Sequence, residues 1–574
     1  MRIPAVLPPC RFRSPALSAI IPALEAPLRK IFPALLAVLL GVILGLLALM
    51  TPSPASPQAA GFSAQRAMVD IEAIAEVPHT VWDQASLPPI RAYIKARLIE
   101  LGLEPIVRDY PAITDGFGHS YPLQNITARI PGKSGTFILL VAHYDSSPKK
   151  RSFEQEGSRG AADDGYGLST LFEIARLIKA SGTTAENGVA FLFTDAEETG
   201  LWGARAEMTS GFEAWKDVNF VINLEARGVK GPAVMFETGR NNLASIELFR
   251  AARWPFAYSF AVDIYRQMPN GTDFTAFLKR GFAGLNFAVL DDLSYYHSPR
   301  DNPANVSLTS LQHYGEEVLP IVKAYTGNPR YAKSDAFVSS QDMVYFNWLP
   351  GLFLSYSGGF AGLLSLVILL CFLAWFLLSV RAKRDRLGSS LLWFLAWLGF
   401  AFASLALGLL ASLVFAKLAG LPWKISYLPG VPGYQVIPWL ALGLELGLAW
   451  LVARAARKRS WGRDSALAGA MAFNLLLLAV FHRFLPGGSF LFAFPVAVSL
   501  LAVLVARLAR APWIALAGPL FAISLFVPVL HLFDLALTLG ALGLVLFMAA
   551  LPIALSAPIL ADSEAPAAEG GGAA

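Results

Sequence analysis

Long uncharged apolar stretches dominate the second half of the chain and constrain its fold more than any other feature. Beyond about residue 350 they follow one another with short loops between them. Each reaches the roughly 17–25 residues that a helix needs to cross a bilayer. The chain is therefore expected to be a multi-pass integral membrane protein in contact with membrane lipid. We place seven spans at residues 359–380, 389–416, 437–453, 465–481, 489–506, 512–530 and 535–555.

A further apolar run, residues 31–50, follows several Arg and Lys residues near the start of the chain. A basic flank before an apolar run is typical of a signal peptide or of a signal anchor. The run approaches the length of a membrane span, and no clear small-residue cleavage site precedes the Pro-rich linker. We therefore interpret it as an uncleaved anchor, which gives eight spans in all.

The shares of apolar and charged residues divide the chain into two parts of different character. Hydrophobic residues make up 55% of the 574 residues and charged residues 15%, against about 25% charged residues in soluble domains. Residues 65–330, by contrast, have the composition of an ordinary globular domain. The net charge of +5 comes largely from Arg/Lys clusters between apolar stretches, so it gives no reason to expect nucleic acid as a partner. Cys10 and Cys371 are the only cysteines, and no disulfide framework is expected.

The loops between the spans predict an orientation. Eleven Lys and Arg residues lie after the second, fourth and sixth spans, and three lie in the alternate loops. Because cytosolic loops are rich in Lys and Arg, both termini are expected in the cytosol and residues 65–330 outside it, in a bacterial periplasm or a eukaryotic lumen. The expected segments are a basic N-terminus (1–30), an anchor (31–50), a linker (51–64), an outer domain (65–330), a connector (331–358), a seven-helix transmembrane domain (359–556) and a disordered tail (557–574).

The outer domain alternates between strand-like and helix-like segments. The runs TFILLVAHY, GVAFLFTDA, FVINLEA and AGLNFAVL are bounded by turn residues and separated by segments such as GLSTLFEIARLIKASG. Strands that alternate with helices predict an α/β domain with a largely parallel sheet. Open sheets of this kind place their sites at the carboxyl ends of the strands, and these ends are rich in His, Asp and Glu.

Two of only seven histidines, His143 and His297, lie at such strand ends. Two imidazoles and several carboxylates suit zinc, and a carboxylate that bridges two ions lets both share a water. Asp145, two residues after His143, faces the same way on a strand and can fix the imidazole tautomer. The acidic residues in these motifs are Asp163, Glu197, Glu198 and Glu225.

Adjacent Glu197 and Glu198 stand where a strand ends and neighbouring side chains diverge. One can bind metal while the other faces the substrate as a general base. Such a pair is costly to place together without a cation.

The segments HYDS, GAADDGYG, TDAEETG, NLEARG and YHSPRDNPANV, in this order, resemble the five motifs of the aminopeptidase Y family of co-catalytic zinc peptidases. That family includes multi-spanning vacuolar and endoplasmic-reticulum membrane metallopeptidases. The resemblance covers about residues 65–330, and the eight-span arrangement is similar to this membrane subgroup. It implies a three-layer α/β/α sandwich of the zinc exopeptidase type, with a mixed and mostly parallel sheet, joined to an α-helical transmembrane domain.

The resemblance also implies roles for individual residues. His143 and Glu225 would hold one zinc, Glu198 and His297 the other, Asp163 would bridge the two ions, and Glu197 would be the general base. The family commonly has Asp at the position of Glu225, although its membrane subgroup resembles this chain. Asp301 matches a further acidic position, and Tyr296 is a candidate to approach the oxyanion. The implied activity is hydrolysis of peptides from one end, with an aminopeptidase favoured over a carboxypeptidase by analogy.

Three alternatives remain open. A glutaminyl cyclase-like acyltransferase would keep a single zinc on Asp163, Glu198 and His297. An inactive receptor-like domain would have broken ligand positions, and none is broken here. The last seven spans could form a transporter, and Glu445 inside one of them is unusual, although it could pair with Asn474. Oligomeric state and substrate specificity are not predicted.

Overall fold

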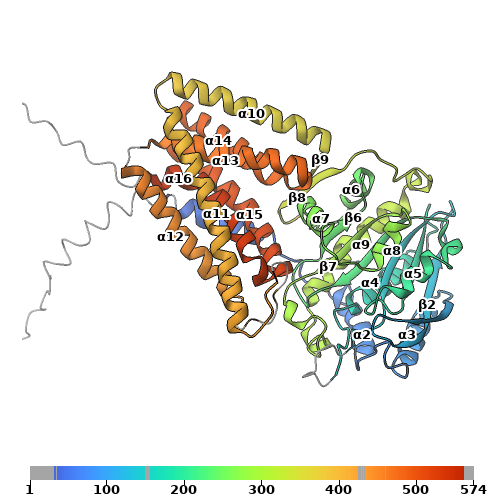
Figure 1. Ribbon diagram of the computed structural model, residues 1–574. Helices are drawn as coiled ribbons and strands as arrows, with labels where there is room; N and C mark the ends of the chain where they lie inside the picture. The colour runs from blue at the N-terminus through green and yellow to red at the C-terminus, as the bar shows by residue number, and fades with distance from the viewer. Residues whose placement is uncertain are drawn as a thin grey trace, which may run out of the picture.

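The structure is a computed structural model that describes residues 32–561 apart from 34, 149–155, 425–427, 429–430, 432–433 and 459–460. An α/β part lies at one end of the molecule and a bundle of long helices at the other (Figure 1). The basic N-terminus (1–30) and most of the expected tail lie outside the described residues.

A seven-stranded sheet forms the centre of the α/β part. Its strands are β1 (Ile106–Thr114), β2 (Ser120–Ile130), β3 (Phe137–His143), β4 (Gly188–Thr194), β5 (Val218–Ala226), β6 (Val234–Thr238) and β7 (Ala283–Val289), in the order β1-β2-β4-β3-β5-β7-β6. The neighbours β4, β3, β5 and β7 are parallel, while β1, β2 and β6 are antiparallel. The four apolar runs predicted to be strands are the four parallel strands, so the predicted mixed α/β sheet is confirmed.

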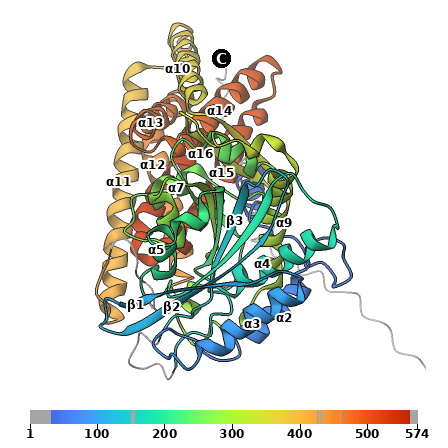
Figure 2. The same cartoon turned by 90° about the vertical axis from the view of Figure 1, so that its right-hand side faces the viewer.

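Helices cover both faces of this sheet and complete three layers (Figure 2). On β3, Ile138 and Leu140 face a core shared with helices α2, α4 and α9, whereas Leu139 and Val141 face a core shared with α5 and α8. This alternation follows from the two-residue period of a strand, and it explains why the strand is apolar throughout. The helices are α2 (Ala64–Ile74), α3 (Leu87–Glu100), α4 (Gly165–Ala180), α5 (Trp202–Met208), α6 (Leu243–Phe249), α7 (Ser259–Tyr265), α8 (Asp273–Lys279) and α9 (Leu308–Gly327).

Seven helices in the described part of the C-terminal half are long and apolar enough to cross a membrane. They coincide with the seven predicted spans. Their bounds are α10 (Gly358–Arg381), α11 (Leu387–Leu418), α12 (Ile437–Lys458), α13 (Arg463–Phe484), α14 (Phe490–Leu508), α15 (Ala517–Leu537) and α16 (Leu542–Ala561). The last helix continues past residue 556, where the tail was expected to begin.

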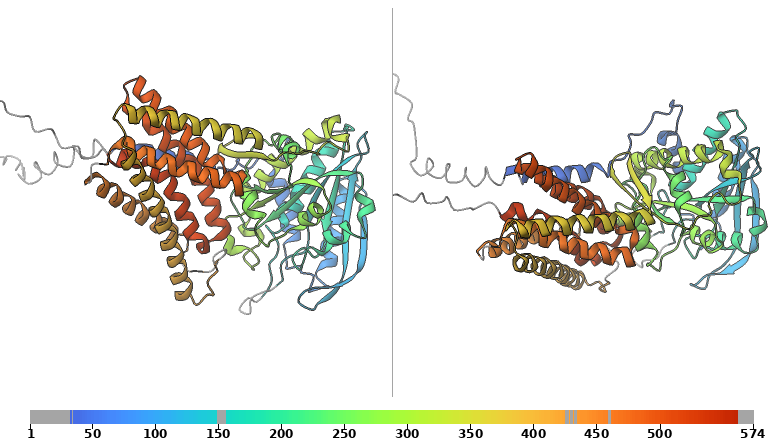
Figure 3. Two further views of the ribbon diagram at one scale, coloured as in Figure 1. Left: turned by 45° about the horizontal axis from the view of Figure 1, so that its top comes forward. Right: turned by 90° about the horizontal axis from the view of Figure 1, so that it is seen from above.

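The apolar run near the start forms a helix that is described from Leu35 to Leu47, shorter than the expected anchor at 31–50. It lies beside α15: a Cβ added to Gly41 would come within 2.9 Å of the Leu520 carbonyl oxygen, and one added to Gly45 within 2.6 Å of the Val527 Cβ. Small residues allow two helices to approach this closely. Figure 3 shows this N-terminal helix among the C-terminal helices.

The connector between the two parts is not irregular, because it contains a hairpin of β8 (Met343–Leu349) and β9 (Leu352–Ser357). The hairpin contacts both parts. Asn347 accepts the N–H of Ala257 at 2.7 Å, and the Trp348 indole donates to Ser524 of α15 at 2.9 Å. The α/β part and the helices are therefore packed directly against each other rather than joined by a loose linker.

Candidate metal centre

The carboxyl ends of the parallel strands bring the predicted site residues together. His143 is the last residue of β3, Glu225 lies near the end of β5, and Glu197 and Glu198 follow β4. Asp163 precedes α4, whose N-terminus is capped by the neighbouring Asp164 through Gly167 N–H at 3.0 Å. All five predicted metal ligands fall into two compact groups that share Asp163.

The first group consists of His143, Asp163 and Glu225, all buried. His143 Nε2 lies 3.3 Å from Asp163 Oδ1 and 3.7 Å from Glu225 Oε2. The Asn223 amide donates to Glu225 Oε1 at 3.1 Å and so holds that carboxylate in place.

The second group consists of Asp163, Glu198 and His297. His297 Nε2 lies 3.3 Å from Asp163 Oδ2 and 2.9 Å from Glu198 Oε2. Asp163 therefore presents one carboxylate oxygen to each histidine. This is the arrangement that a carboxylate bridging two ions requires.

The local backbone explains how these side chains reach one centre. Ala196 has φ of +55°, which turns the chain sharply just before Glu197 and Glu198. Glu198 points to His297, while Glu197 lines a cavity next to Glu225 and Asp163. His297 itself has φ of +53°, a conformation that costs free energy in most residues and is concentrated at functional sites. The predicted divergence of the two glutamates is thus present.

The electrostatics of the centre favour a cation. Burial and the neighbouring Glu225 raise the pKa of Glu197 well above its ordinary value, and burial likewise raises the pKa of Glu225. Burial also acts to raise the pKa of Asp163, but its hydrogen bonds with His143 and His297 outweigh this and lower it. Carboxylates crowded in this way repel one another, and divalent cations relieve that repulsion.

The donor set fits zinc. Tetrahedral zinc with nitrogen and oxygen ligands at about 2.0–2.2 Å separates its ligand atoms by roughly 3.3–3.6 Å. Three of the four imidazole–carboxylate distances, 3.3, 3.3 and 3.7 Å, lie at or near that range, and the fourth is 2.9 Å. In each group one imidazole and two carboxylates leave a fourth position for water, as in catalytic zinc sites.

Asp145 makes contacts that sequence reasoning anticipated only in part. The His143 Nδ1 atom lies 2.9 Å from the Asp145 backbone carbonyl and 3.5 Å from its carboxylate. The tautomer is therefore fixed mainly by the carbonyl, which accepts the Nδ1 proton and leaves Nε2 for metal. The carboxylate instead accepts the backbone N–H groups of Glu197 at 2.9 Å and Glu198 at 3.2 Å.

Two further residues from the last motif border the centre. Asp301 accepts the Ala162 N–H at 2.7 Å and the Ser158 hydroxyl at 3.0 Å, so it anchors the loop that carries Asp163. Burial and the charge of Asp163 raise the pKa of Asp301 to about 7. Tyr296 stacks on the His297 ring with 3.6 Å between ring centroids and lines the same cavity as Glu197.

Sequence reasoning missed Asp273, the first residue of α8. It is buried, hydrogen bonded to Thr194 at the end of β4, and close enough to His143 for their charges to interact. Burial raises its pKa to about 6. The capping box formed by Thr272 and Thr275 marks the start of α8, but nothing in the sequence indicates that this start lies beside the end of β4.

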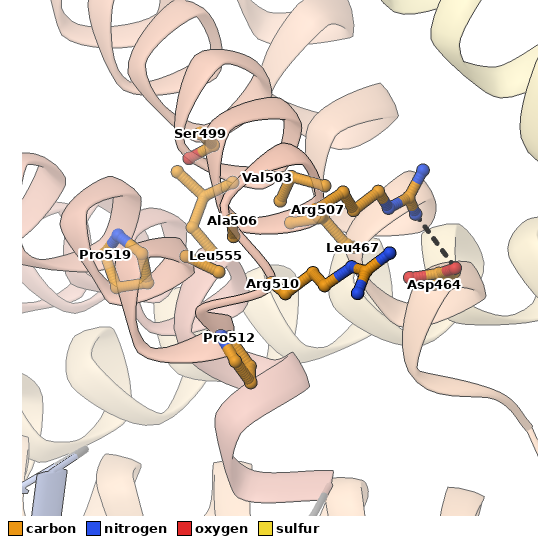
Figure 4. Close-up of a pocket in the computed structure, with 11 residues that line it drawn as sticks. Asp464, Leu467, Ser499, Val503, Ala506, Arg507, Arg510, Pro512, Pro519 and Leu555 are labelled. Atoms are coloured by element: carbon orange, nitrogen blue, oxygen red, sulfur yellow. Dashed lines mark hydrogen bonds and ion pairs between the residues drawn. The ribbon is translucent and has the colours of Figure 1, made fainter.

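The remaining histidines and Glu445 lie outside the two groups. His79 and His313 are buried and bonded to backbone groups, and none of the other five histidines joins a ligand cluster among the described residues. Glu445 is buried in α12, and Asn474, considered as its partner, donates to the Ala470 carbonyl at 3.0 Å. A separate cavity of about 360 Å³ lies among the C-terminal helices beside the Arg507–Asp464 ion pair (Figure 4), and none of the predicted site residues lines it.

Residues 125–322 match the family described as Peptidase family M28. The chain carries a peptidase family M28 domain. This domain contains all five predicted ligands and therefore both of the ligand groups described above. The match starts in β2 and ends in α9, so it covers most of the sheet.

Relatives of the M28 domain include membrane proteins. The chain is 30% identical over 277 residues to a putative endoplasmic reticulum metallopeptidase 1-A of Caenorhabditis elegans, covering 47% of this chain and 30% of that protein. It is 29% identical over 259 residues to a vacuolar membrane protease of Candida dubliniensis, covering 43% and 26%. The matched part thus spans less than a third of the length of these relatives.

Among solved structures, the chain is similar to a glutaminyl cyclase of Porphyromonas gingivalis, with 19% identity and a TM-score of 0.39. The similarity covers 46% of this chain and 99% of that one.

Proposed function

We propose that the protein is a membrane-bound, zinc-dependent exopeptidase that removes residues from one end of peptides, most simply as an aminopeptidase. The observation that carries this proposal is the position of Asp163, whose two carboxylate oxygens face two histidines in two separate ligand groups. In this proposal His143 and Glu225 hold one zinc, Glu198 and His297 hold the other, and Asp163 bridges them.

Zinc ions in these positions would lower the pKa of a bound water towards about 7 and polarise the substrate carbonyl. Glu197 lines the cavity next to Asp163 and Glu225, and it serves as the general base. It accepts the proton of the attacking water and delivers it to the leaving amine. Asp145 holds the backbone of Glu197, and Tyr296, which lines the same cavity, would donate a hydrogen bond to the oxygen of the carbonyl under attack.

A peptidase is favoured over a glutaminyl cyclase because the first ligand group is complete. A single-zinc enzyme needs only Asp163, Glu198 and His297, yet His143 and Glu225 are also buried and form a second ligand group with Asp163. The intact ligand positions equally argue against an inactive receptor. The named relatives, a metallopeptidase and a protease, agree with this choice.

We further propose that the seven C-terminal helices and the N-terminal anchor cross a membrane, with residues 65–330 outside the cytosol. The length and apolar character of the helices support the spans, and the Lys/Arg-rich alternate loops support the orientation.

The test is hydrolysis of leucyl- and alanyl-p-nitroanilide by the full-length protein, purified in detergent. Hydrolysis is expected to stop when zinc is chelated and to return when zinc is restored. Glu197→Gln, which keeps the size of the side chain but cannot take a proton, is expected to lower kcat by at least about 100-fold. Cyclisation of N-terminal glutamine without hydrolysis of either substrate would overturn the peptidase assignment.

A further inference from the structure

The cavity that contains Glu197, Asp163 and Glu225 extends from the α/β part to the C-terminal helices. Its volume is about 550 Å³. Its lining includes these three carboxylates and, from α15, Leu532, Phe533, Ala536 and Leu537. We call this cavity the chamber. It is large enough for the side chain and backbone of at least one substrate residue.

The four α15 residues form one face of the last turns of that helix. Their spacing, i, i+1, i+4 and i+5, places them side by side on a helix surface. Leu535 belongs to the same turn but does not line the chamber. The helix therefore presents a continuous aliphatic and aromatic surface to the chamber.

The position of α15 relative to the catalytic residues is fixed by direct packing. Phe260 of α7 packs against Phe533 with 5.2 Å between ring centroids and the rings tilted by 36°. Beside this contact, Ser259 donates to the Gly487 carbonyl at 2.6 Å, and Gly487 N–H donates to Asp263 at 2.7 Å. One hydrophobic core includes Tyr258 and Phe260 together with residues of α14 and α15.

The rest of the lining is largely apolar, although Arg227, Gln267, Asn270 and Thr272 also border the chamber. The apolar side chains include Phe236 and Tyr265, whose rings meet edge to face at 4.8 Å, and Met268. A wall of this kind favours apolar side chains, because a polar group held against it would lose its hydrogen bonds to water.

We infer that α15 forms the specificity wall of the substrate site, so that the chamber selects peptides with a large apolar side chain at the residue whose bond is cut. This inference rests on the proposed function and assigns the helical part a role in substrate selection in addition to anchoring. Phe533 and Ala536 of α15 line the same cavity as Glu197, the proposed general base.

The first experiment narrows the chamber with Ala536→Phe and uses Leu535→Phe as the matched control. The full-length protein is assayed with leucyl-, phenylalanyl-, alanyl- and glycyl-p-nitroanilide. Wild type is expected to prefer the leucyl and phenylalanyl substrates. Ala536→Phe is expected to lower kcat/KM for those two by at least about 10-fold, with less than about 2-fold change for the glycyl substrate. Leu535→Phe is expected to leave the order of preference unchanged.

A second experiment measures whether a substrate occupies the chamber, without requiring that it is hydrolysed. Ala536→Cys and Leu535→Cys are made separately in a background of Cys10→Ser, Cys371→Ser and Glu197→Gln. The rate of methanethiosulfonate labelling is then measured with a leucyl or a glycyl dipeptide. Leucyl dipeptide is expected to slow labelling at position 536 by at least about 5-fold, in line with occupancy of most of the site at saturation. Position 535 is expected to be unaffected.

The outcomes separate the two claims. If the protein hydrolyses the substrates, but both Phe variants change kcat/KM for all of them alike and position 536 is not protected, the role of α15 is overturned. The assignment as a peptidase then stands. Protection of position 536 without hydrolysis of any substrate upholds the chamber and overturns the proposed function. If the protein hydrolyses none of the substrates and position 536 is not protected, both the chamber and the proposed function are overturned.

Discussion

The carboxylate of Asp145 accepts a hydrogen bond from the backbone N–H of Glu197 at 2.9 Å. The same carboxylate accepts the N–H of Glu198 at 3.2 Å, while its own backbone carbonyl meets His143 Nδ1. One buried residue thus joins the turn that carries the proposed base to a proposed zinc ligand. Asp145 acts as a positioning residue for both.

The first prediction concerns Asp145→Asn. An amide can accept only one of the two N–H groups, and its NH₂ group faces the other, so the turn that carries Glu197 should shift. We expect kcat to fall by about 10–100-fold, as for other residues that orient metal ligands, with KM nearly unchanged. Steady-state kinetics and zinc content together check this. A kcat equal to that of wild type would show that the carboxylate does not position Glu197.

The second prediction concerns a buried ionic network on α5. Glu207 is fully buried and accepts from Arg108 at 2.9 Å, the Asn125 amide at 2.9 Å and the Trp215 indole at 2.7 Å. Glu207→Ala leaves these three donors without their acceptor and should lower the free energy of unfolding by about 3–5 kcal/mol. Denaturant unfolding followed by intrinsic fluorescence measures this change.

Glu213→Ala is the matched control for that experiment, because Glu213 pairs with Lys216 on the surface with 79% of its side chain exposed. Exposed ion pairs of this kind contribute little to stability. Equal destabilisation by the two substitutions would contradict the role of the Glu207 network.

The third prediction is a pH dependence of stability that arises from His313. Its Nδ1 accepts the Ala233 N–H at 2.8 Å, and its Nε2 donates to the Trp254 carbonyl at 2.8 Å, so the folded state holds the neutral imidazole. Burial lowers its pKa to about 4. The unfolded chain, in which a histidine has a pKa of about 6.5, therefore binds more protons than the folded chain between pH 4 and about 6.5.

Stability from this group is therefore present above pH 6.5 and is lost as the pH falls towards 4, by about 3 kcal/mol in all. His313→Gln keeps an acceptor and a donor but does not titrate. Its unfolding free energy is expected to fall less steeply than that of wild type between pH 6.5 and 4. Parallel slopes for the two proteins would show that His313 titrates normally in the folded state.

The sequence predicted the parallel centre of the sheet but not its edges. Strands β3 and β5 are buried on both faces, so each is a continuous apolar run that stands out in the sequence. By contrast, β1 has only exposed and half-buried residues and includes Pro111, and β6 has only five residues. Such strands are formed by pairing with a neighbour more than by their own composition.

The proposed ligands His143, Glu198 and Glu225 follow or end strongly apolar strands and Asp163 lies in a glycine-rich turn, so these four could be proposed from the sequence, whereas His297 comes after a 3-10 turn beyond β7. The second function of Asp145 was not predictable, since it depends on the turn at Ala196, whose positive φ brings two backbone N–H groups towards one carboxylate. Asp273 and the α15 wall were missed for a related reason. Both reach the centre through contacts between segments far apart in the chain.

The most direct test of the two-zinc centre is the zinc content of the purified full-length protein, measured by inductively coupled plasma mass spectrometry for wild type, Glu225→Ala and Glu198→Ala. Thermal melting confirms that each variant is folded. Two zinc ions per chain are expected for wild type and about one for each variant, because each substitution removes a ligand from only one group. One zinc in wild type that persists in Glu225→Ala would contradict the two-zinc centre.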